Sequence, residues 1–351
     1  SAASDVYKRQ IVSSYAVALV LCVVTMLCWG SWGNTQKLAG KTWRYELFYW
    51  DYVIGILLFS LLIGFTLGSF GEGGRSFVDD LKQVSSASVL SAVAGGIIFN
   101  LSNILLSAST SLAGLSIAFP VGCGLALVLG VVNNYLFVGG DQGDPVLIFS
   151  GVALVMVALI LNGVAAAKKG NGEASKETGN AASTAKKGVV LAIIAGVLMS
   201  TFYALVARAM DVTNFENPAE GLATPYTAFF LFAVGIFVSN FLFNTIVMKK
   251  PFEGEPVGYD TYFKGKLSTH MVGVLGGCVW GLGTVLSYIA SGKIGASISY
   301  ALGQGAPMIA ALWGVFIWKE FKGSKSIVNI LLSLMFVLFI VGLGMIAVAK
   351  S

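Results

Sequence analysis

Ten continuous apolar runs, each long enough to cross a lipid bilayer as a helix, dominate this sequence. A transmembrane helix needs about 20 mostly apolar residues, whereas a transmembrane strand alternates apolar and polar residues over about ten. Continuous runs therefore predict an all-α integral membrane protein with ten transmembrane helices. The runs cover residues 12–32, 47–70, 87–108, 112–137, 145–167, 188–210, 225–248, 270–290, 295–318 and 327–349.

The composition also indicates a lipid environment. Of the 351 residues, 56% are hydrophobic and only 11% are charged, too few charges for the surface of a soluble protein of this size. The net charge of +5 is interpreted as a topology signal, so no nucleic-acid partner is expected. The four cysteines lie in apolar runs without metal-ligand spacing, so no metal site is expected.

The chain divides into four segments. Residues 1–10 resemble the translated end of a sequencing-library transposon and are interpreted as an adapter scar outside the fold. Residues 11–167 contain five of the apolar runs, and residues 188–351 contain the other five. Between them, the polar, Gly/Ala/Ser-rich residues 168–187 lack apolar periodicity, which predicts a flexible linker.

The two halves resemble each other. Shifting residues 94–137 by 181 positions aligns them without a gap with part of the second half, so that Gly95 and Gly96 match Gly276 and Gly277. Because each half has an odd number of helices, the second half must enter the membrane from the opposite side. The sequence therefore predicts two inverted five-helix repeats, an architecture typical of secondary transporters that work by alternating access.

Lysine and arginine are unevenly distributed between the two sides of the membrane. The loops after the first, fifth, seventh and ninth spans carry fifteen of them, and the other side carries five once residues 1–10 are set aside. Positively charged loops stay in the cytoplasm. The linker is therefore predicted to be cytoplasmic and both termini to lie outside, in a bacterial inner (plasma) membrane.

Several segments resemble the ureide permeases of plants and their bacterial relatives. They are CWGSWGNTQKL (28–38), YWDYVIGILLFSLLIGFTLGSFG (49–71), AGGIIFNLSNI (94–104), AGLSIAFPVGCG (113–124), VVNNYL (131–136) and GQGAPMIAALWGVFIWKEFKGSKS (303–326). The match covers nearly all ten spans and implies the drug/metabolite transporter superfamily, to which the glucose/ribose porters also belong. The fourth span departs from the pattern, because Phe119 to Cys123 stand where plant members carry an acidic residue.

The resemblance implies uptake of a small neutral polar metabolite, such as a ureide, a nucleobase or nucleoside, or a sugar, coupled to H⁺ or Na⁺. The alternative is a drug or metabolite exporter of the same superfamily, which would favour an acidic residue deep in the first span; this chain has none there. A membrane-embedded enzyme would need a catalytic constellation that the sequence lacks, so no enzymatic activity is expected. The lipid bilayer and the substrate are the expected partners, a homodimer is compatible with the sequence, and no cofactor is expected beyond the coupling ion.

A transporter needs polar groups and aromatic faces near the middle of the membrane to replace water around its substrate. Uncharged side chains of this kind recur at repeat-related positions of the central spans, although hydrogen bonds between helices are the competing interpretation for the asparagines. The predicted substrate-binding residues are Trp29, Trp32, Asn100, Asn103, Phe119, Tyr203, Trp280, Thr284, Tyr288, Tyr300 and Gln304. Pro120 and Pro307 interrupt their spans and are predicted to be hinges that line the site.

Asp51 is the one acidic residue placed well within a span. At about 1.5 Å per residue from the start of the second run, its carboxylate lies about 6 Å inside the cytoplasmic boundary of the membrane. Two interpretations stay open: a structural pair with Arg44, or a coupling residue that takes up and releases a proton. The single histidine, His270, lies at the start of the eighth run and is assigned no role.

Overall fold

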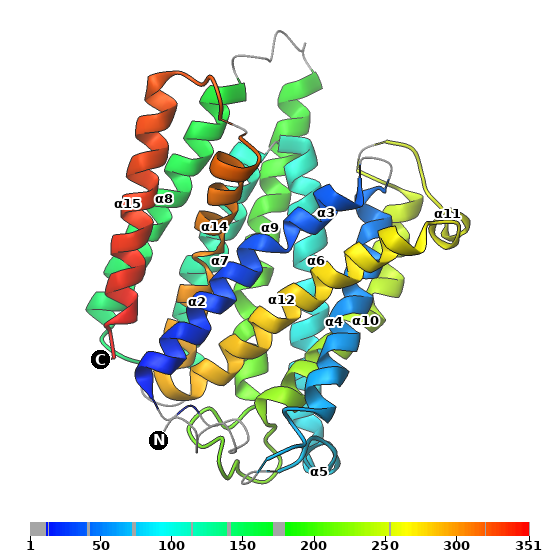
Figure 1. Cartoon of the computed structure of the whole chain (residues 1–351), viewed down its shortest axis with the longest axis vertical. Helices are drawn as coiled ribbons and strands as arrows, with labels where there is room; N and C mark the ends of the chain where they lie inside the picture. The colour runs from blue at the N-terminus through cyan, green and yellow to red at the C-terminus, as the bar shows by residue number, and fades with distance from the viewer. Residues whose placement is uncertain are drawn as a thin grey trace.

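The structure is a computed structural model that describes residues 12, 14–40, 43–71, 75–113, 115–138, 142–170, 180–252, 254–319 and 321–350, without the side chains of residues 111, 115–117, 119, 170 and 180–185. It is a bundle of helices (Figure 1), and the described residues contain one isolated β-bridge and no strand. Ten candidate spans in this part of the chain are long and apolar enough to cross a membrane. The predicted all-α membrane fold with ten spans is confirmed.

The spans follow the predicted order, and their bounds shift by several residues. They are α2 and α3 (Tyr15–Ser31 and Gly33–Ala39), α4 (Tyr45–Phe65), α6 (Ser86–Ala113), α7 (Leu115–Phe137), α8 (Pro145–Gly170), α9 (Asn180–Arg208), α10 (Pro225–Lys249), α12 (Leu267–Ile294), the consecutive α13, α14 and π-helix η1 (Ala296–Gly303, Ala306–Leu312 and Trp313–Ile317), and α15 (Ser326–Ala347). Within the predicted linker, residues 168–170 continue α8 and residues 180–187 belong to α9, while residues 171–179 lie outside the described part.

Two short helices were not predicted. They are α5 (Phe77–Gln83) and α11 (Tyr259–Phe263), and each follows the second span of its half. Ser76 caps α5 by accepting the backbone N–H of Asp79, a capping arrangement that satisfies an otherwise unpaired donor. Helices this short fall below the length that an apolar run can reveal, which explains why the sequence did not indicate them.

The ninth span is broken rather than kinked. α13 ends at Gly303, α14 starts at Ala306, and Gln304 and Gly305 form a turn between them. Pro307 lies in the first turn of α14, where its missing N–H needs no partner within the helix. The sequence predicted one interrupted helix here, and the two glycines beside Gln304 together with the proline account for the complete break.

Helices from the two halves cross at glycines. A Cβ added to Gly277 of α12 would lie 2.0 Å from the Tyr52 carbonyl oxygen of α4, and one added to Gly96 of α6 would lie 2.1 Å from the Phe232 carbonyl oxygen of α10. Glycine is therefore needed for these backbones to approach so closely. Both crossings join the second span of one half to the third span of the other, so the same contact recurs with the halves exchanged.

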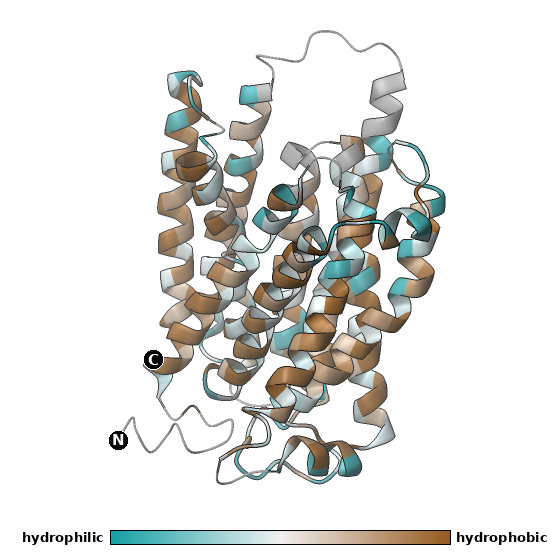
Figure 2. Cartoon of the chain, turned by 45° about the vertical axis from the view of Figure 1, so that its right-hand side comes forward, coloured by the Kyte–Doolittle hydropathy of each residue, from teal (hydrophilic) through white to brown (hydrophobic). Residues whose placement is uncertain are grey.

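The two ends of the bundle are named here by their short helices. In Figure 1 the start of α2, the end of α15 and α5 lie at one end, which we call the α5 end. The start of α4, the end of α8 and α11 lie toward the other, which we call the α11 end. Figure 2 shows hydrophobic residues along the helices and hydrophilic residues mainly toward the two ends, as expected for a bundle surrounded by lipid.

Candidate functional site

A cavity of about 690 Å³ lies between the two halves at the α11 end. It reaches from the middle of α6 to loop residues Arg44, Phe252 and Gly254, and its other walls come from α2, α3, α4, α10 and α14. Pockets for small molecules typically measure about 300–1,000 Å³. This cavity is therefore large enough for a metabolite and is open toward one end of the bundle.

The deeper walls of the cavity combine aromatic faces with uncharged polar groups. Trp29 and Trp32 contribute indole rings, and Gln36, Asn103 and Ser107 contribute amide and hydroxyl groups. Such a lining can replace the hydrogen bonds of water around a ligand and stack on a ring or a sugar face. Three of the predicted substrate-binding residues, Trp29, Trp32 and Asn103, line this cavity.

An ion pair lies at the mouth of the cavity. Arg44 donates to both carboxylate oxygens of Glu46, at 2.7 and 3.2 Å, and also to the carbonyl oxygen of Glu255. The suggested pairing of Arg44 with Asp51 is therefore wrong, because Glu46 is close enough to hold both arms of the guanidinium. The charges of Arg44 and Glu46 therefore compensate each other within this pair.

Two more predicted residues support Trp29 from behind. The Trp29 indole N–H donates to the Thr284 hydroxyl at 3.1 Å, and Thr284 donates in turn to the Trp280 carbonyl oxygen at 3.0 Å. The rings of Trp29 and Trp280 stack with centroids 6.1 Å apart. Trp280 is 5% exposed and packs against Phe99 and Tyr52. Thr284 and Trp280 therefore position the cavity wall and do not line it.

Asn100 lies outside the cavity and connects three helices. Its side chain is fully buried, accepts from the Tyr49 hydroxyl at 2.9 Å, and donates to the Ile236 carbonyl oxygen and the Ser239 hydroxyl at 3.2 and 2.9 Å. In this conformation Asn100 holds neighbouring helices together by hydrogen bonds, which was the competing interpretation for the asparagines. Tyr49 also accepts a hydrogen bond from Asn103 at 3.2 Å, so it connects this buried site to the cavity wall.

The three predicted tyrosines lie in a closed region toward the α5 end. Tyr203, Tyr288 and Tyr300 are fully buried, and none lines the cavity. The Tyr203 hydroxyl lies 2.9 Å from that of Ser287, and Tyr300 donates to the Ala126 carbonyl oxygen at 2.9 Å. The Tyr288 hydroxyl is buried without a hydrogen-bond partner among the described residues, which is unusual for a polar group.

Gln304 and the two prolines have different environments. Gln304 occupies the break in the ninth span, is partly exposed, and forms no side-chain hydrogen bond with another described residue. The break itself packs on the cavity wall, because a Cβ at Gly303 would lie 2.6 Å from the Trp29 ring. Pro307 is buried at this break, whereas Pro120 lies inside the otherwise continuous α7. The side chain of Phe119 lies outside the described part of the structure.

Asp51 forms the centre of a buried polar cluster at the α11 end. The side chain is 1% exposed, and its Oδ1 lies 2.6 Å from the Tyr262 hydroxyl and 2.7 Å from Nδ1 of His270. Its Oδ2 accepts from the Trp43 indole at 3.0 Å. Burial, followed by the bond to Asp51, raises the pKa of the Tyr262 phenol, which keeps Tyr262 a donor at neutral pH. Sequence reasoning missed His270, Tyr262 and Trp43 as partners of Asp51.

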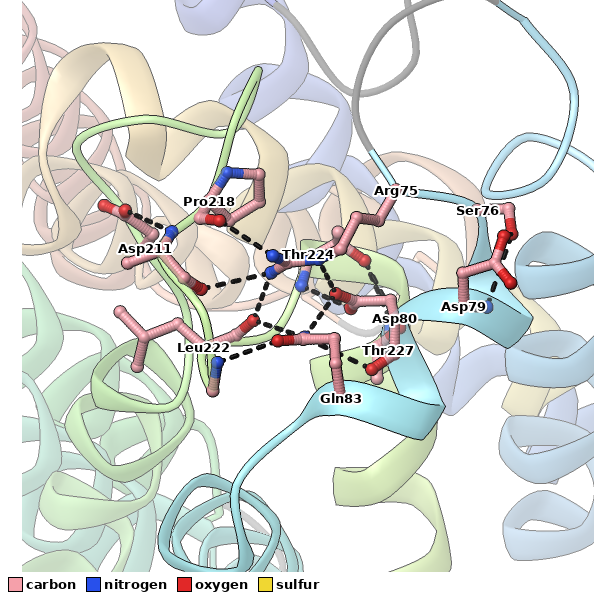
Figure 3. A network of polar contacts seen from close by, with 12 residues as sticks. Arg75, Ser76, Asp79, Asp80, Gln83, Asp211, Pro218, Leu222, Thr224 and Thr227 are labelled. Carbon is pink, nitrogen blue, oxygen red and sulfur yellow. Dashed lines mark hydrogen bonds and ion pairs between the residues drawn. The ribbon is translucent and has the colours of Figure 1, made fainter.

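A second polar network lies at the α5 end (Figure 3). Asp80 of α5 is fully buried, pairs with Arg75 at 2.9 Å, and accepts the backbone N–H of Thr224, the residue before α10, at 2.7 Å. Arg75 also donates to the carbonyl oxygens of Pro218 and Leu222 at 2.8 and 2.7 Å. The network therefore ties the first half of the chain to the loop between α9 and α10. Its only sequence signal is the Ser76 cap before two aspartates.

Comparison with known proteins adds independent information. The family model described as ureide permease matches residues 48–188 and 171–349. Ureide permease 1 of Arabidopsis thaliana is 24% identical over 97% of this chain and 98% of its own length. A protein of Enterococcus faecalis named for sugar uptake is 22% identical over 92% of this chain and 96% of its own length.

A solved crystal structure shares the fold. It superimposes with a TM-score of 0.60 at 16% identity, covering 93% of this chain and 96% of its own. The ten spans and the family match together make this chain a multi-pass membrane transporter of small metabolites. The chain belongs to the ureide permease family.

Proposed function

We propose that this permease imports a small neutral polar metabolite by alternating access, with uptake coupled to an ion. The proposal rests on the cavity that Trp29, Trp32 and Asn103 line. The loop residues that also line it, Arg44, Phe252 and Gly254, lie at the α11 end. At the α5 end, the Arg75–Asp80 network ties the segment before α5 to the loop between α9 and α10, and we propose that it closes this end. A transporter that alternates must close one end while the other is open.

The lining favours the class of substrate. Uncharged amides, hydroxyls and indoles form the deep walls, and the Arg44–Glu46 charges compensate each other at the mouth. A ureide, a nucleobase or nucleoside, and a sugar all present hydrogen-bonding groups around a compact, neutral body. The names of the relatives, ureide permease and sugar uptake protein, fall within the same class. The proposed substrate-binding residues are those on the cavity wall, with Gln304 and the closed tyrosine region joining them as the site opens to the other side.

The orientation proposed for the membrane places the α11 end in the cytoplasm of a bacterial cell. The excess of lysine and arginine on the predicted linker side supports it. In a cysteine-free variant, a cysteine at the linker position Ser175 should react with an impermeant maleimide only after lysis. A cysteine at the exposed Glu220, in the loop between α9 and α10, should react in intact cells. The reverse pattern would contradict the orientation.

Uptake by proteoliposomes tests the substrate site. Labelled allantoin, uracil and glucose represent the three proposed substrate types. For the transported compound, Asn103→Ala should raise KM about two- to twelvefold, because a lost hydrogen bond to a neutral ligand is worth about 0.5–1.5 kcal/mol. Asn133→Ala is the matched control, because Asn133 bonds to Ser200 away from the cavity.

The outcomes separate the alternatives. A raised KM in Asn103→Ala with an unchanged KM in Asn133→Ala supports the cavity as the binding site. Equal effects of the two substitutions would assign Asn103 to helix packing. Faster efflux than uptake in oriented vesicles would favour the exporter.

A further inference from the structure

We infer that Asp51 and His270 bind the coupling proton as a pair. This inference rests on the proposed ion-coupled transport and identifies both the ion and the residues that carry it. Asp51 belongs to the first half of the chain and His270 to the second, so the pair bridges the two halves.

The contacts of Asp51 leave one place in the pair for an exchangeable proton. Trp43 and Tyr262 donate to the Asp51 carboxyl group and keep their own protons at neutral pH. Oδ1 of Asp51 lies 2.7 Å from Nδ1 of His270, and either atom can be the donor in this contact. The imidazole has a second nitrogen, Nε2, so the pair can hold one proton more than this contact uses.

Water can reach the pair only from the side of the histidine. The His270 side chain is 19% exposed and that of Asp51 is 1% exposed. Gly265 packs against the ring, and a Cβ there would lie 2.6 Å from Nε2 and 2.4 Å from the Trp43 ring. A proton therefore reaches the pair through the imidazole, from the α11 end.

Protonation changes the charge of the pair from −1 to zero. A buried uncompensated charge is unfavourable, and an imidazolium next to the carboxylate removes the excess. Trp43 and Tyr262 enclose the imidazole with ring centroids 4.9 and 4.7 Å from it. Trp43 comes from the loop before α4, and Tyr262 comes from α11. Proton binding by the pair is therefore linked to the positions of these two segments.

At the α11 end, the described residues form two further charged pairs, neither of which includes Asp51 or His270. Arg44 is held by Glu46, and Lys264 and Asp260 form an exposed pair on and beside α11. Tyr262 is titratable and contacts both members of the Asp51–His270 pair, and it acts as a donor. The cluster also disfavours Na⁺, because Trp43, Tyr262 and His270 surround the carboxyl group and the described residues add no set of oxygen ligands for a hard cation.

The pair communicates with the cavity through α4. Tyr52, next to Asp51, packs against Trp32 on the cavity wall with ring centroids 4.5 Å apart. Arg44, the residue directly before α4, also lines the cavity. A change at Asp51 that displaces the start of α4 therefore also displaces the substrate site.

Two measurements test the inference, and the first does not depend on any substrate. The sequence has one histidine, His270, so ¹⁵N-histidine labelling of protein purified without a histidine tag gives the signals of a single imidazole, one for each ring nitrogen. At the same pH, Asp51→Asn should show a smaller protonated fraction than the wild type, because the carboxylate no longer stabilises the cation. Lys264→Gln, which removes a nearby exposed charge, should titrate like the wild type. Equal titrations in the wild type and Asp51→Asn would overturn the pair.

The second measurement tests coupling by transport in proteoliposomes. His270→Gln that keeps the wild-type size-exclusion profile should lose accumulation of the transported probe driven by an imposed pH difference, whereas Lys264→Gln should accumulate it like the wild type. One coupled proton would give the wild type at most about tenfold accumulation per pH unit. pH-driven accumulation by His270→Gln, or accumulation by the wild type driven by Na⁺ instead, would overturn the inference. Failure of all probes to exchange would count against the proposed substrate class, while the titration still decides the pair.

Discussion

The third spans of the two halves, α6 and α12, have matched places in the fold but opposite surroundings. Asn103 and Ser107 of α6 line the cavity, whereas their repeat counterparts, Thr284 and Tyr288 of α12, are fully buried. Equivalent positions of the two halves of the chain thus line an open cavity at the α11 end in one case and are buried toward the α5 end in the other. The comparison teaches that two similar segments of sequence can hold different states within one molecule, because each state depends on what packs against them.

The polar clusters at the two ends differ in a corresponding way. At the α5 end, Arg75 and Asp80 form a pair whose cation stays charged at any physiological pH. At the α11 end, Asp51 lies 2.7 Å from Nδ1 of His270, the two residues of the proposed proton-binding pair. The α5 end therefore carries a fixed charge, whereas the α11 end carries the groups proposed to exchange a proton.

The largest effect is expected from removing the fixed charge at the α5 end. Arg75→Ala leaves the Asp80 carboxylate buried without its partner, and breaking a buried pair costs about 3–5 kcal/mol. The closed end should then open. Cys22, which is fully buried and contacts Ser299, is a natural reporter once the other three cysteines are replaced. An impermeant thiol reagent added at the α5 end should label Cys22 far faster in this variant.

A control for this experiment lies on α5, the helix that carries Asp80. Lys82 and Asp79 form an exposed pair with atoms 3.7 Å apart, and such pairs contribute about 0–1 kcal/mol. Lys82→Ala should leave the labelling of Cys22 unchanged. The size-exclusion profile reports whether Arg75→Ala is folded. If the variant is folded and Cys22 is still protected, the network is structural and does not close the end.

An intermediate effect is expected at the break in the ninth span, which lies between the two ends. Gln304→Ala should raise KM severalfold, since its amide is partly exposed and forms no side-chain bond within the described residues. The repeat-related Cys123 lies in the unbroken α7, so Cys123→Ala provides the matched comparison. Kinetic measurements that find the same KM in both variants and the wild type would remove Gln304 from the substrate site.

The smallest effect concerns the pH response of the α5 end. Asp211 lies in the loop between α9 and α10. Partial burial raises the pKa of its carboxyl group, but hydrogen bonds from Thr213, Ala219 and Asn214 outweigh this effect and lower the pKa. A lowered pKa means that Asp211 stabilises the loop above its ordinary value of about 3.9 and loses this contribution as the pH falls through the lower folded value. Hydrogen exchange of residues 213–219 should therefore be constant from pH 6 to 8 and accelerate only in acid, after correction for intrinsic rates.

Asp211→Asn sharpens this last comparison. It should abolish the acid-dependent part of the exchange, and the loop should exchange faster than in the wild type from pH 6 to 8 because the stabilising carboxylate is gone, with a rate that does not depend on pH after the same correction. A response of the loop between pH 6 and 8 would show that the α5 end also contains a titrating group, contrary to the division between fixed and titratable ends.

Part of the site could be recognised from residue types alone. Trp29, Trp32 and Asn103 were predicted from their place in central spans, and the structure brings them to one cavity. Asn100 and Tyr300 satisfied the same criteria but bond to neighbouring helices instead. A polar residue in a span has the same sequence signature whether it faces a cavity or another helix, because both environments exclude lipid.

The sequence by itself determined the number and order of the spans, because crossing a bilayer requires only a local stretch of about 20 apolar residues. It did not determine which side chains meet. Asp51 and His270 are 219 positions apart, and Arg75 reaches carbonyl groups 143 and 147 positions away. These contacts depend on how each helix is rotated and where it crosses its neighbours, as at Gly277 against Tyr52. Helices that are apolar on nearly every face carry little record of that rotation, so only the tertiary structure decided it.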